Sequence, residues 1–226
     1  MIELIRVTRE YRKGRGIHDI SLRVDKGDWV VIVGHAGAGK STLLRTVYAE
    51  HRPDSGEVIV GQYRLSSLKD RHIPKLRRLL GIVDQDLALV QDRTVYQNVA
   101  LVGEVLGWSQ GKTKAAALRV LNRVGLYNHL DSYPAQLSFG EHRRLAIARA
   151  LVGEPFALVM DEPLGHLDRD TALGIVDLLA SIHSKGTALL MATHRAELLE
   201  GKPIQTFRIE RGKLLAPLTA NGEVSA

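Results

Sequence analysis

At 226 residues, with 45% hydrophobic and 25% charged side chains, the chain has the size of one globular domain, or of a core with an inserted subdomain. Cysteine is absent, which excludes disulfides and thiolate metal sites. No apolar run approaches the ~20 residues that span a bilayer, so we expect no transmembrane helix. Charged residues interrupt the first residues too often for a signal peptide. A net charge of +6 favours anionic partners, whether nucleotide, acidic lipid or nucleic acid, without choosing among them.

Two segments near the start alternate apolar and polar side chains, the pattern of strands with one buried face. They cover residues 2–7 and 18–24, and we expect antiparallel strands with Tyr11 in the basic turn between them. After a turn at 26–28, the β-branched run Val30–Val33 has the continuous apolar character of a buried parallel strand.

The octet after this run matches the phosphate-loop pattern G-x-x-x-x-G-K-[ST], and apolar residues then recur at helical spacing. Its glycines let backbone N–H groups surround phosphates, and the helix adds its positive dipole end. Lys40 can reach the β- and γ-phosphates, and the Ser41 hydroxyl can hold Mg²⁺. A glycine-rich turn with a solvated lysine is the alternative, but the flanking strand and helix favour a nucleoside triphosphate site. The predicted nucleotide contacts here are Gly34, His35, Ala36, Gly37, Ala38, Gly39, Lys40, Ser41 and Thr42.

The rest of the chain predicts an α/β core interrupted by a helical segment. Strands vanish between about Leu87 and Glu154, so we expect a core of residues 1–86 and 155–216, a helical subdomain of residues 87–154 and a flexible tail of residues 217–226. The remaining predicted strands are Val58–Val60, Gly81–Val83, Phe156–Met160, Thr187–Met191 and a hairpin of Ile204–Ile209 with Lys213–Leu214. The predicted helices are Ile73–Leu80, Thr94–Val105, Thr113–Val124, Ser138–Val152 and Thr171–Ser184.

Two carboxylates, Asp161 and Glu162, follow a buried apolar strand. Ligands of open α/β sheets bind at the carboxyl ends of the strands, so Asp161 can orient hydrated Mg²⁺ and Glu162 can accept a proton from the attacking water. A surface turn before Pro163 is the alternative, and the phosphate loop makes the catalytic interpretation the stronger one.

The segment Leu137–Glu141 begins a helix, because Ser138 and Glu141 have the spacing of a capping box. A capped helix with a glycine in its first turn is also a site for an anion. Its use depends on what faces it, which the local sequence does not say.

Taken together, these residues resemble the ABC ATPase family over nearly the whole chain. GHAGAGKS resembles the Walker A motif, ALVMDE the Walker B motif and LSFGE the LSGGQ signature. Alone, a tyrosine is ordinarily half-buried and a histidine structural, but the ordered set of motifs favours the family roles. The positions that match the remaining motifs are Tyr11 of the A-loop, Gln85 of the Q-loop, Asp168 of the D-loop and His194 of the switch.

The resemblance implies a P-loop NTPase (RecA-like) core with an N-terminal antiparallel β-subdomain and an inserted helical subdomain. It implies ATP and Mg²⁺ as cofactors, with Ser41, Gln85 and Asp161 around the metal and Glu162, His194 and Gln85 as catalytic residues. It also implies a homodimer closed head to tail around two ATPs. Ser138 and Gly140 of one chain would then face the γ-phosphate bound by the Lys40 of the other.

Within the family, residues 68–102 resemble the FtsE group, the ATPase partners of the bacterial division membrane protein FtsX. This resemblance implies a peripheral protein at the cytoplasmic face of the inner membrane that passes ATP-driven motion through FtsX to peptidoglycan hydrolases, with no nucleic acid partner. The subunit of an ABC transporter, or of a lipoprotein-releasing or macrolide-export system, is the alternative. A soluble ABC ATPase acting on DNA or ribosomes is a third, although such proteins usually carry two cassettes or a coiled-coil insertion.

The sequence departs from the family pattern at five positions. Phe139 replaces the first signature glycine and Glu141 the usual glutamine, while Asp84 stands where an aromatic residue is usual. Leu164 and His166 replace the common Thr and Asn beside the D-loop. None of these changes removes a predicted catalytic group.

Overall fold

The computed structural model describes residues 1–11 and 14–218. Four strands form an antiparallel sheet in the order β2-β1-β4-β5. The predicted pairing of the first two strands is confirmed, but Tyr11 was wrongly placed in a turn: it pairs with Arg15 at the end of the first strand. The strands of this sheet are β1 (Ile2–Tyr11), β2 (Arg15–Val24), β4 (Ser55–Val60) and β5 (Tyr63–Arg64).

The second, central sheet has six strands in the order β10-β9-β3-β8-β7-β6. All neighbours pair in parallel except β10, which is antiparallel to β9 at one edge. This is the arrangement expected of buried apolar strands in an α/β fold. The strands are β3 (Trp29–Val33), β6 (Leu80–Val83), β7 (Ala157–Asp161), β8 (Ala188–Ala192), β9 (Gln205–Glu210) and β10 (Lys213–Leu218).

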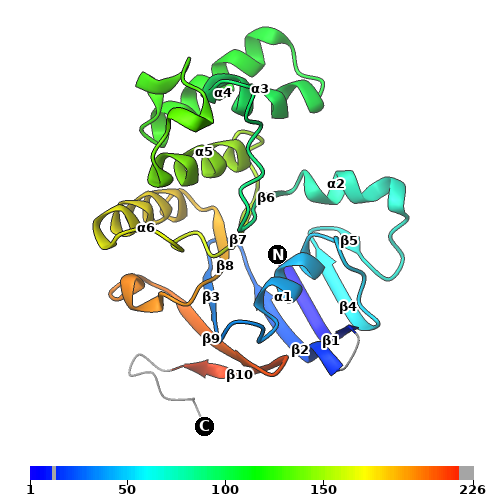
Figure 1. The fold of residues 1–226 in the computed structure, drawn as a ribbon. Helices are drawn as coiled ribbons and strands as arrows, with labels where there is room; N and C mark the ends of the chain where they lie inside the picture. The colour runs from blue at the N-terminus through cyan, green and yellow to red at the C-terminus, as the bar shows by residue number, and fades with distance from the viewer. Residues whose placement is uncertain (12–13, 219–226) are drawn as a thin grey trace.

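The helices divide into two groups around these sheets (Figure 1). Helix α1 lies between the sheets, while α3, α4 and α5 gather at one end of the molecule, with α6 beside α5. Between β6 and β7 every described element is helical. The α-helices are α1 (Lys40–Val47), α2 (Ile73–Arg77), α3 (Val95–Val105), α4 (Gln110–Arg123), α5 (Phe139–Leu151) and α6 (Arg169–His183). Short 3₁₀ turns are η2 (Asp70–His72), η3 (Tyr127–His129), η4 (Pro134–Gln136) and η5 (Ala196–Leu199).

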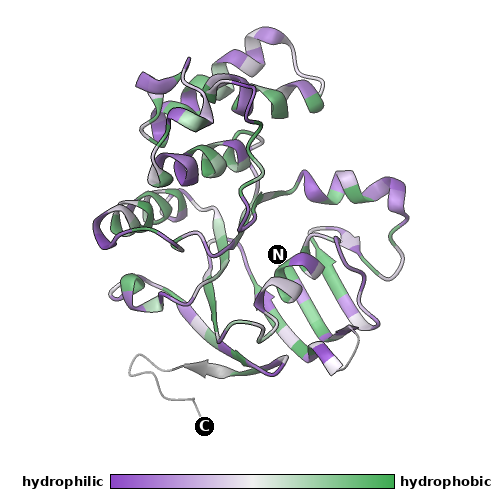
Figure 2. Ribbon diagram, in the orientation of Figure 1, coloured by the Kyte–Doolittle hydropathy of each residue, from purple (hydrophilic) through white to green (hydrophobic). Residues whose placement is uncertain are grey.

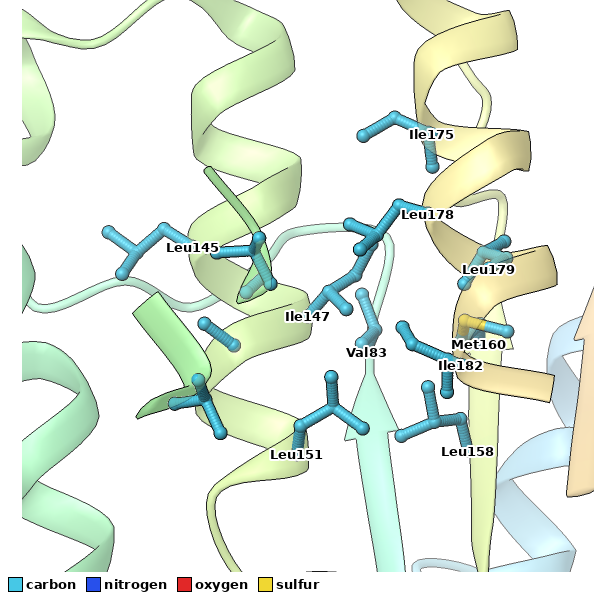
Figure 3. Packing of buried hydrophobic residues seen from close by; sticks show 14 of the residues in the cluster. Val83, Leu145, Ile147, Leu151, Leu158, Met160, Ile175, Leu178, Leu179 and Ile182 are labelled. Atoms are coloured by element: carbon cyan, nitrogen blue, oxygen red, sulfur yellow. The ribbon is translucent and has the colours of Figure 1, made fainter. Parts of the chain in front are cut away.

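Side chains alternate between two buried cores along the central strands. On β3, Trp29 and Val31 belong to a core shared with α3–α6, whereas Val30 and Ile32 belong to a core shared with α1 and the antiparallel sheet. Figure 3 shows the first core, with residues of α5 and α6 such as Ile147 and Leu179 closing over the central strands. Hydrophobic residues accordingly concentrate in the strands and on the inner faces of the helices (Figure 2).

Several predicted boundaries shift for local reasons. Helix α2 ends at Arg77, earlier than predicted, because Leu80 already pairs with Ala157 in the central sheet. Helix α4 begins at Gln110, earlier than predicted, because the Ser109 side chain caps it by accepting from the Lys112 N–H. Within residues 1–11 and 14–218, no helix has the length and apolar character to cross a membrane.

Candidate nucleotide site

The phosphate loop connects β3 to α1, and the backbone explains its glycines. At Gly39, φ is +113°, a left-handed conformation that favours glycine, and an added Cβ would lie 2.8 Å from the Gly16 carbonyl oxygen. At Gly34, a Cβ would lie 2.4 Å from the Ile209 carbonyl oxygen, so β9 leaves no room for a side chain. The loop is therefore packed against its neighbours at both ends.

Lys40 is buried and folded back over this loop. Its Nζ donates to the carbonyl oxygens of Gly34, at 2.8 Å, and of His35, at 3.2 Å. The ammonium group thus lies at the mouth of the loop, where the phosphates of a nucleotide would meet it.

Glu162 links Lys40 to His194. The Glu162 Oε1 atom lies 3.8 Å from Lys40 Nζ, while Oε2 lies 2.9 Å from His194 Nδ1 and accepts from the His194 backbone N–H at 3.3 Å. The Glu162 backbone is held in turn by its N–H donating to the Ala192 carbonyl, and its φ of +47° is rare for a side chain other than glycine. Such strain is retained where the surrounding structure fixes it, often at functional sites.

Asp161 is the last residue of β7 and is 95% buried. Burial raises the pKa of its carboxyl group, and a hydrogen bond with the nearby Ser41 hydroxyl lowers it in part. Its buried Oδ1 atom has no hydrogen-bond partner. An orphaned carboxylate oxygen beside a hydroxyl fits a hard cation such as Mg²⁺. Because no group of three His, Cys, Asp or Glu residues within the described chain could hold a metal, phosphate and water oxygens would complete the shell.

These groups line one cavity of about 350 Å³. Gln85 reaches this cavity from the loop after β6, where its N–H donates to Asp84 Oδ1 at 2.7 Å. Thr42 lies in the first turn of α1, Gly34 and His35 border a neighbouring cavity of about 520 Å³, and Ala36 lines both cavities. The lining residues are Ala36, Gly37, Lys40, Ser41, Gln85, Asp161, Glu162, Gly165, His166 and His194.

Besides several backbone positions of the phosphate loop and its helix, four predicted contacts from other segments do not line this cavity: Tyr11, Ser138, Gly140 and Asp168. The Tyr11 ring packs edge to face on His51 and is partly exposed. Ser138 and Asp168 cap α5 and α6, and Gly140 of α5 lies so close to α6 that a Cβ would be 2.4 Å from Thr171 Cγ2. The structure therefore packs the start of α5 against the start of α6, and Ser138, Gly140 and Asp168 do not line the cavity of their own chain.

Two arginines near the site were missed by the sequence analysis. Arg143 of α5 is buried, and its guanidinium lies 3.4 Å from the Gln85 carbonyl oxygen and 3.5 Å from that of Gly165. Arg195 donates to the carbonyl oxygens of Leu164 and Leu167 and so fixes the segment before Asp168. Both act on backbone carbonyls far away in the sequence, so no local motif could have revealed them.

Comparison with known proteins decides the family. The family model described as ABC transporter matches residues 17–165, which contain the phosphate loop, the signature and both acidic residues. The chain belongs to the ABC transporter ATPase family. This ABC ATPase is 40% identical to the cell division ATP-binding protein FtsE of Mycobacterium tuberculosis, over 95% of this chain and 94% of the relative. It is 36% identical to FtsE of Escherichia coli, over 95% and 97%.

Solved structures agree with this assignment. The ATP-binding cassette MJ0796, dimeric in a post-hydrolysis state with ADP and Pi, superimposes with a TM-score of 0.86 at 28% identity, covering 99% of this chain and all of that one. CbiO1 of Clostridium perfringens, part of the ABC transporter complex cbiONQ, gives 0.87 at 27% identity over 96% of this chain and 87% of that one. The predicted fold class is confirmed, and the chain is an ATP-binding and ATP-hydrolysing enzyme of the ABC type.

Proposed function

We propose that this ABC ATPase drives an FtsE–FtsX-like membrane complex and passes ATP-dependent motion to a membrane partner in cell division, where it activates peptidoglycan hydrolases. The FtsE relatives, similar over almost their full length, support this proposal. The observation that carries the catalytic part is the position of Glu162, between the ammonium group of Lys40 and the imidazole of His194.

We assign the roles in the site from this geometry. Lys40 and the loop amides hold the β- and γ-phosphates, and Glu162 accepts a proton from the attacking water while His194 orients the Glu162 carboxylate. Ser41, Asp161 and Gln85 are the residues that would hold Mg²⁺, which when bound neutralises developing phosphate charge.

The signature residues act on a second copy of the chain. Ser138, Gly140 and Asp168 lie together at the N-terminal ends of α5 and α6, outside the cavity of their own chain. In a head-to-tail homodimer these helix ends face the γ-phosphate bound by the partner's loop, and Tyr11 stacks on the adenine of its own nucleotide. The dimeric MJ0796 cassette supports this arrangement.

The membrane partner docks on the helical side of the molecule. Residues 87–154 act as a helical subdomain between the core segments 1–86 and 155–216. A groove of about 440 Å³ between α2, α3 and α5 offers an apolar floor, including Val105, which is 69% exposed, and a basic rim with Arg77 and Arg149. This docking holds the protein peripherally at the cytoplasmic face of the inner membrane, and no nucleic acid takes part. The predicted flexible tail, residues 217–226, lies largely outside the described residues.

A transporter subunit is the second candidate. MJ0796 is described as a bacterial ABC transporter cassette and cbiO1 as part of a transporter complex, and both superimpose over most of the chain. The nucleotide site would be the same, so only the membrane partner separates the two candidates.

The Glu162→Gln variant tests the catalytic role of Glu162, and it also serves to identify the membrane partner. We expect ATP hydrolysis to fall by at least about 10²-fold while ATP binding remains, because the amide cannot accept the proton. Glu3→Gln, on β1 and away from the cavity, is the matched control. If Glu162→Gln hydrolyses ATP at the parent rate, Glu162 is not the proton acceptor.

The partner is identified by capture of the ATP-loaded Glu162→Gln protein from detergent-solubilised membranes. Recovery of an FtsX-like protein supports the division complex. Recovery of an exporter or a lipoprotein-releasing permease instead supports the second candidate.

A further inference from the structure

The signature serine is occupied by its own helix. The Ser138 Oγ–H donates to Glu141 Oε2 at 2.7 Å, and the Ser138 backbone N–H donates to the same oxygen at 2.8 Å. These hydrogen bonds hold the pKa of the Glu141 carboxyl group below its usual value, so the group is ionised. A full negative charge therefore stands at the helix end that the proposed dimer aims at the partner's γ-phosphate.

Two histidines from different elements contact this pair. His129, at the end of η3, places Nε2 3.2 Å from Glu141 Oε1, the oxygen that Ser138 does not use. His142, one turn into α5, places Nδ1 2.8 Å from the Ser138 carbonyl oxygen. The Phe139 ring lies beside His142 and is 78% exposed, so this corner faces outward.

The carboxylate that caps the neighbouring helix α6 is already engaged. Helix α6 packs against Gly140 through Thr171, and its capping carboxylate, Asp168, accepts from the Thr171 N–H at 2.9 Å. The charges that act on Glu141 are those of the two histidines. The imidazoles of His129 and His142 are thus the groups that can offset the carboxylate.

We propose that His129 is a positioning residue for the signature serine: its protonated imidazole neutralises Glu141, frees the Ser138 hydroxyl for the partner's γ-phosphate, and so tightens the ATP-bound dimer below neutral pH. Histidine side chains in general change charge between about pH 5 and 8. Without this offset, the Glu141 carboxylate repels the phosphate and keeps accepting the hydrogen bond from the Ser138 hydroxyl. The inference rests on the proposed head-to-tail dimer and adds to it a pH dependence located where η3 contacts the start of α5.

The test measures the dimer dissociation constant by analytical ultracentrifugation with ATP at pH 8 and pH 6, on the Glu162→Gln protein that retains ATP. We expect the dimer to be roughly fivefold tighter at pH 6, the size of effect that a partly exposed ion pair supports. Adding His129→Gln should remove this gain and leave a weaker dimer at pH 6. Adding Glu141→Gln should give a tight dimer at both pH values.

His72→Gln, in η2 directly before α2, is the matched control and should keep the parent profile. Thermal unfolding checks that each variant is folded. If His129→Gln does not fold, Glu141→Gln still tests the inference. A dimer whose pH profile is unchanged by both His129→Gln and Glu141→Gln overturns this inference alone. A parent that stays monomeric with ATP at every pH overturns the proposed dimer, and this inference with it.

Discussion

His194 Nδ1 lies 2.9 Å from Glu162 Oε2, although the two residues are 32 positions apart. They meet because β7 and β8 are parallel neighbours, with Asp161 paired to Ala192, and each side chain follows the carboxyl end of its strand. The contact is a direct product of sheet topology, and it places a histidine where it can hold the carboxylate that we propose as catalytic in one orientation.

His194→Ala should lower kcat by roughly 10²-fold and change KM by less than about threefold, because in the proposed mechanism His194 orients Glu162 and does not take part in ATP binding. Steady-state ATPase kinetics measure both values. His194→Asn is the matched variant, since its amide can take the place of Nδ1 beside Glu162, and it should retain more activity than alanine. Equal losses for the two variants would mean that the contact with Glu162 is not what matters.

Asp84 ties the loop of Gln85 to the phosphate-loop helix. Its Oδ1 accepts from the Gln85 N–H at 2.7 Å and lies 3.9 Å from Arg45 Nη2 of α1. Asp84→Ala should lower kcat by about tenfold, because Gln85 loses its fixed position. Asp84→Asn keeps the acceptor and loses only a weak, partly exposed ion pair, so its kcat should stay near the parent value. If Asp84→Asn lowers kcat as much as Asp84→Ala does, the charge of Asp84, and not its acceptor oxygen, causes the loss.

Gly140→Ala should destabilise the protein by about 1–3 kcal/mol, because the new methyl group would meet Thr171 Cγ2 at 2.4 Å. Urea unfolding measures the free energy. Thr171→Ser removes the clashing methyl group and keeps the hydroxyl, so the double variant should recover most of the loss. If it recovers none, the clash with α6 is not the cause.

Asp54 anchors the end of β1 beside Tyr11. Its carboxylate accepts from the Glu10 N–H at 2.7 Å and from Arg9 Nη1 at 2.6 Å, and these bonds, the backbone one first, lower the pKa of Asp54. A carboxyl group whose pKa is lowered by folding stabilises the protein above its unfolded pKa of about 3.9, and loses that effect as the pH falls through the folded value.

Asp54→Asn should therefore unfold more easily than the parent at pH 7, with the two curves converging below about pH 4. Thermal unfolding across pH 3–8 checks this expectation. Asp92→Asn, in the loop before α3, is the matched control and should follow the parent at every pH. A constant gap between Asp54→Asn and the parent at all pH values would exclude the charged carboxylate as the source.

Local chemistry explains what the sequence predicts well. The phosphate loop, the cap at Ser138 and the apolar central strands each depend on residues within a few positions of one another. The types of the predicted core elements therefore match the structure with shifted ends, although β5 (Tyr63–Arg64) was not predicted. The roles of the individual site residues remain predictions.

Long-range pairing explains what the sequence does not reveal. The second strand of the predicted hairpin is confirmed, yet nothing local shows that β9 also runs parallel to β3. Arg143 binds carbonyl groups that any residue could provide, so its partners leave no trace in the sequence. Tyr11 continues β1 because it pairs with Arg15 on the next strand. The prediction placed it in a turn because the composition of the local sequence is typical of a turn.

The central sheet divides the described molecule into two cores with no buried residue in common. A cavity on one face, as from Leu145→Ala in α5, removes packing from the helical side, while α1 and the phosphate loop remain supported from the other face. Partial unfolding should then release the helical end first and leave the nucleotide held. Heat or mutation would thus disrupt the helical side, where we propose that the membrane partner docks, before ATP binding is lost.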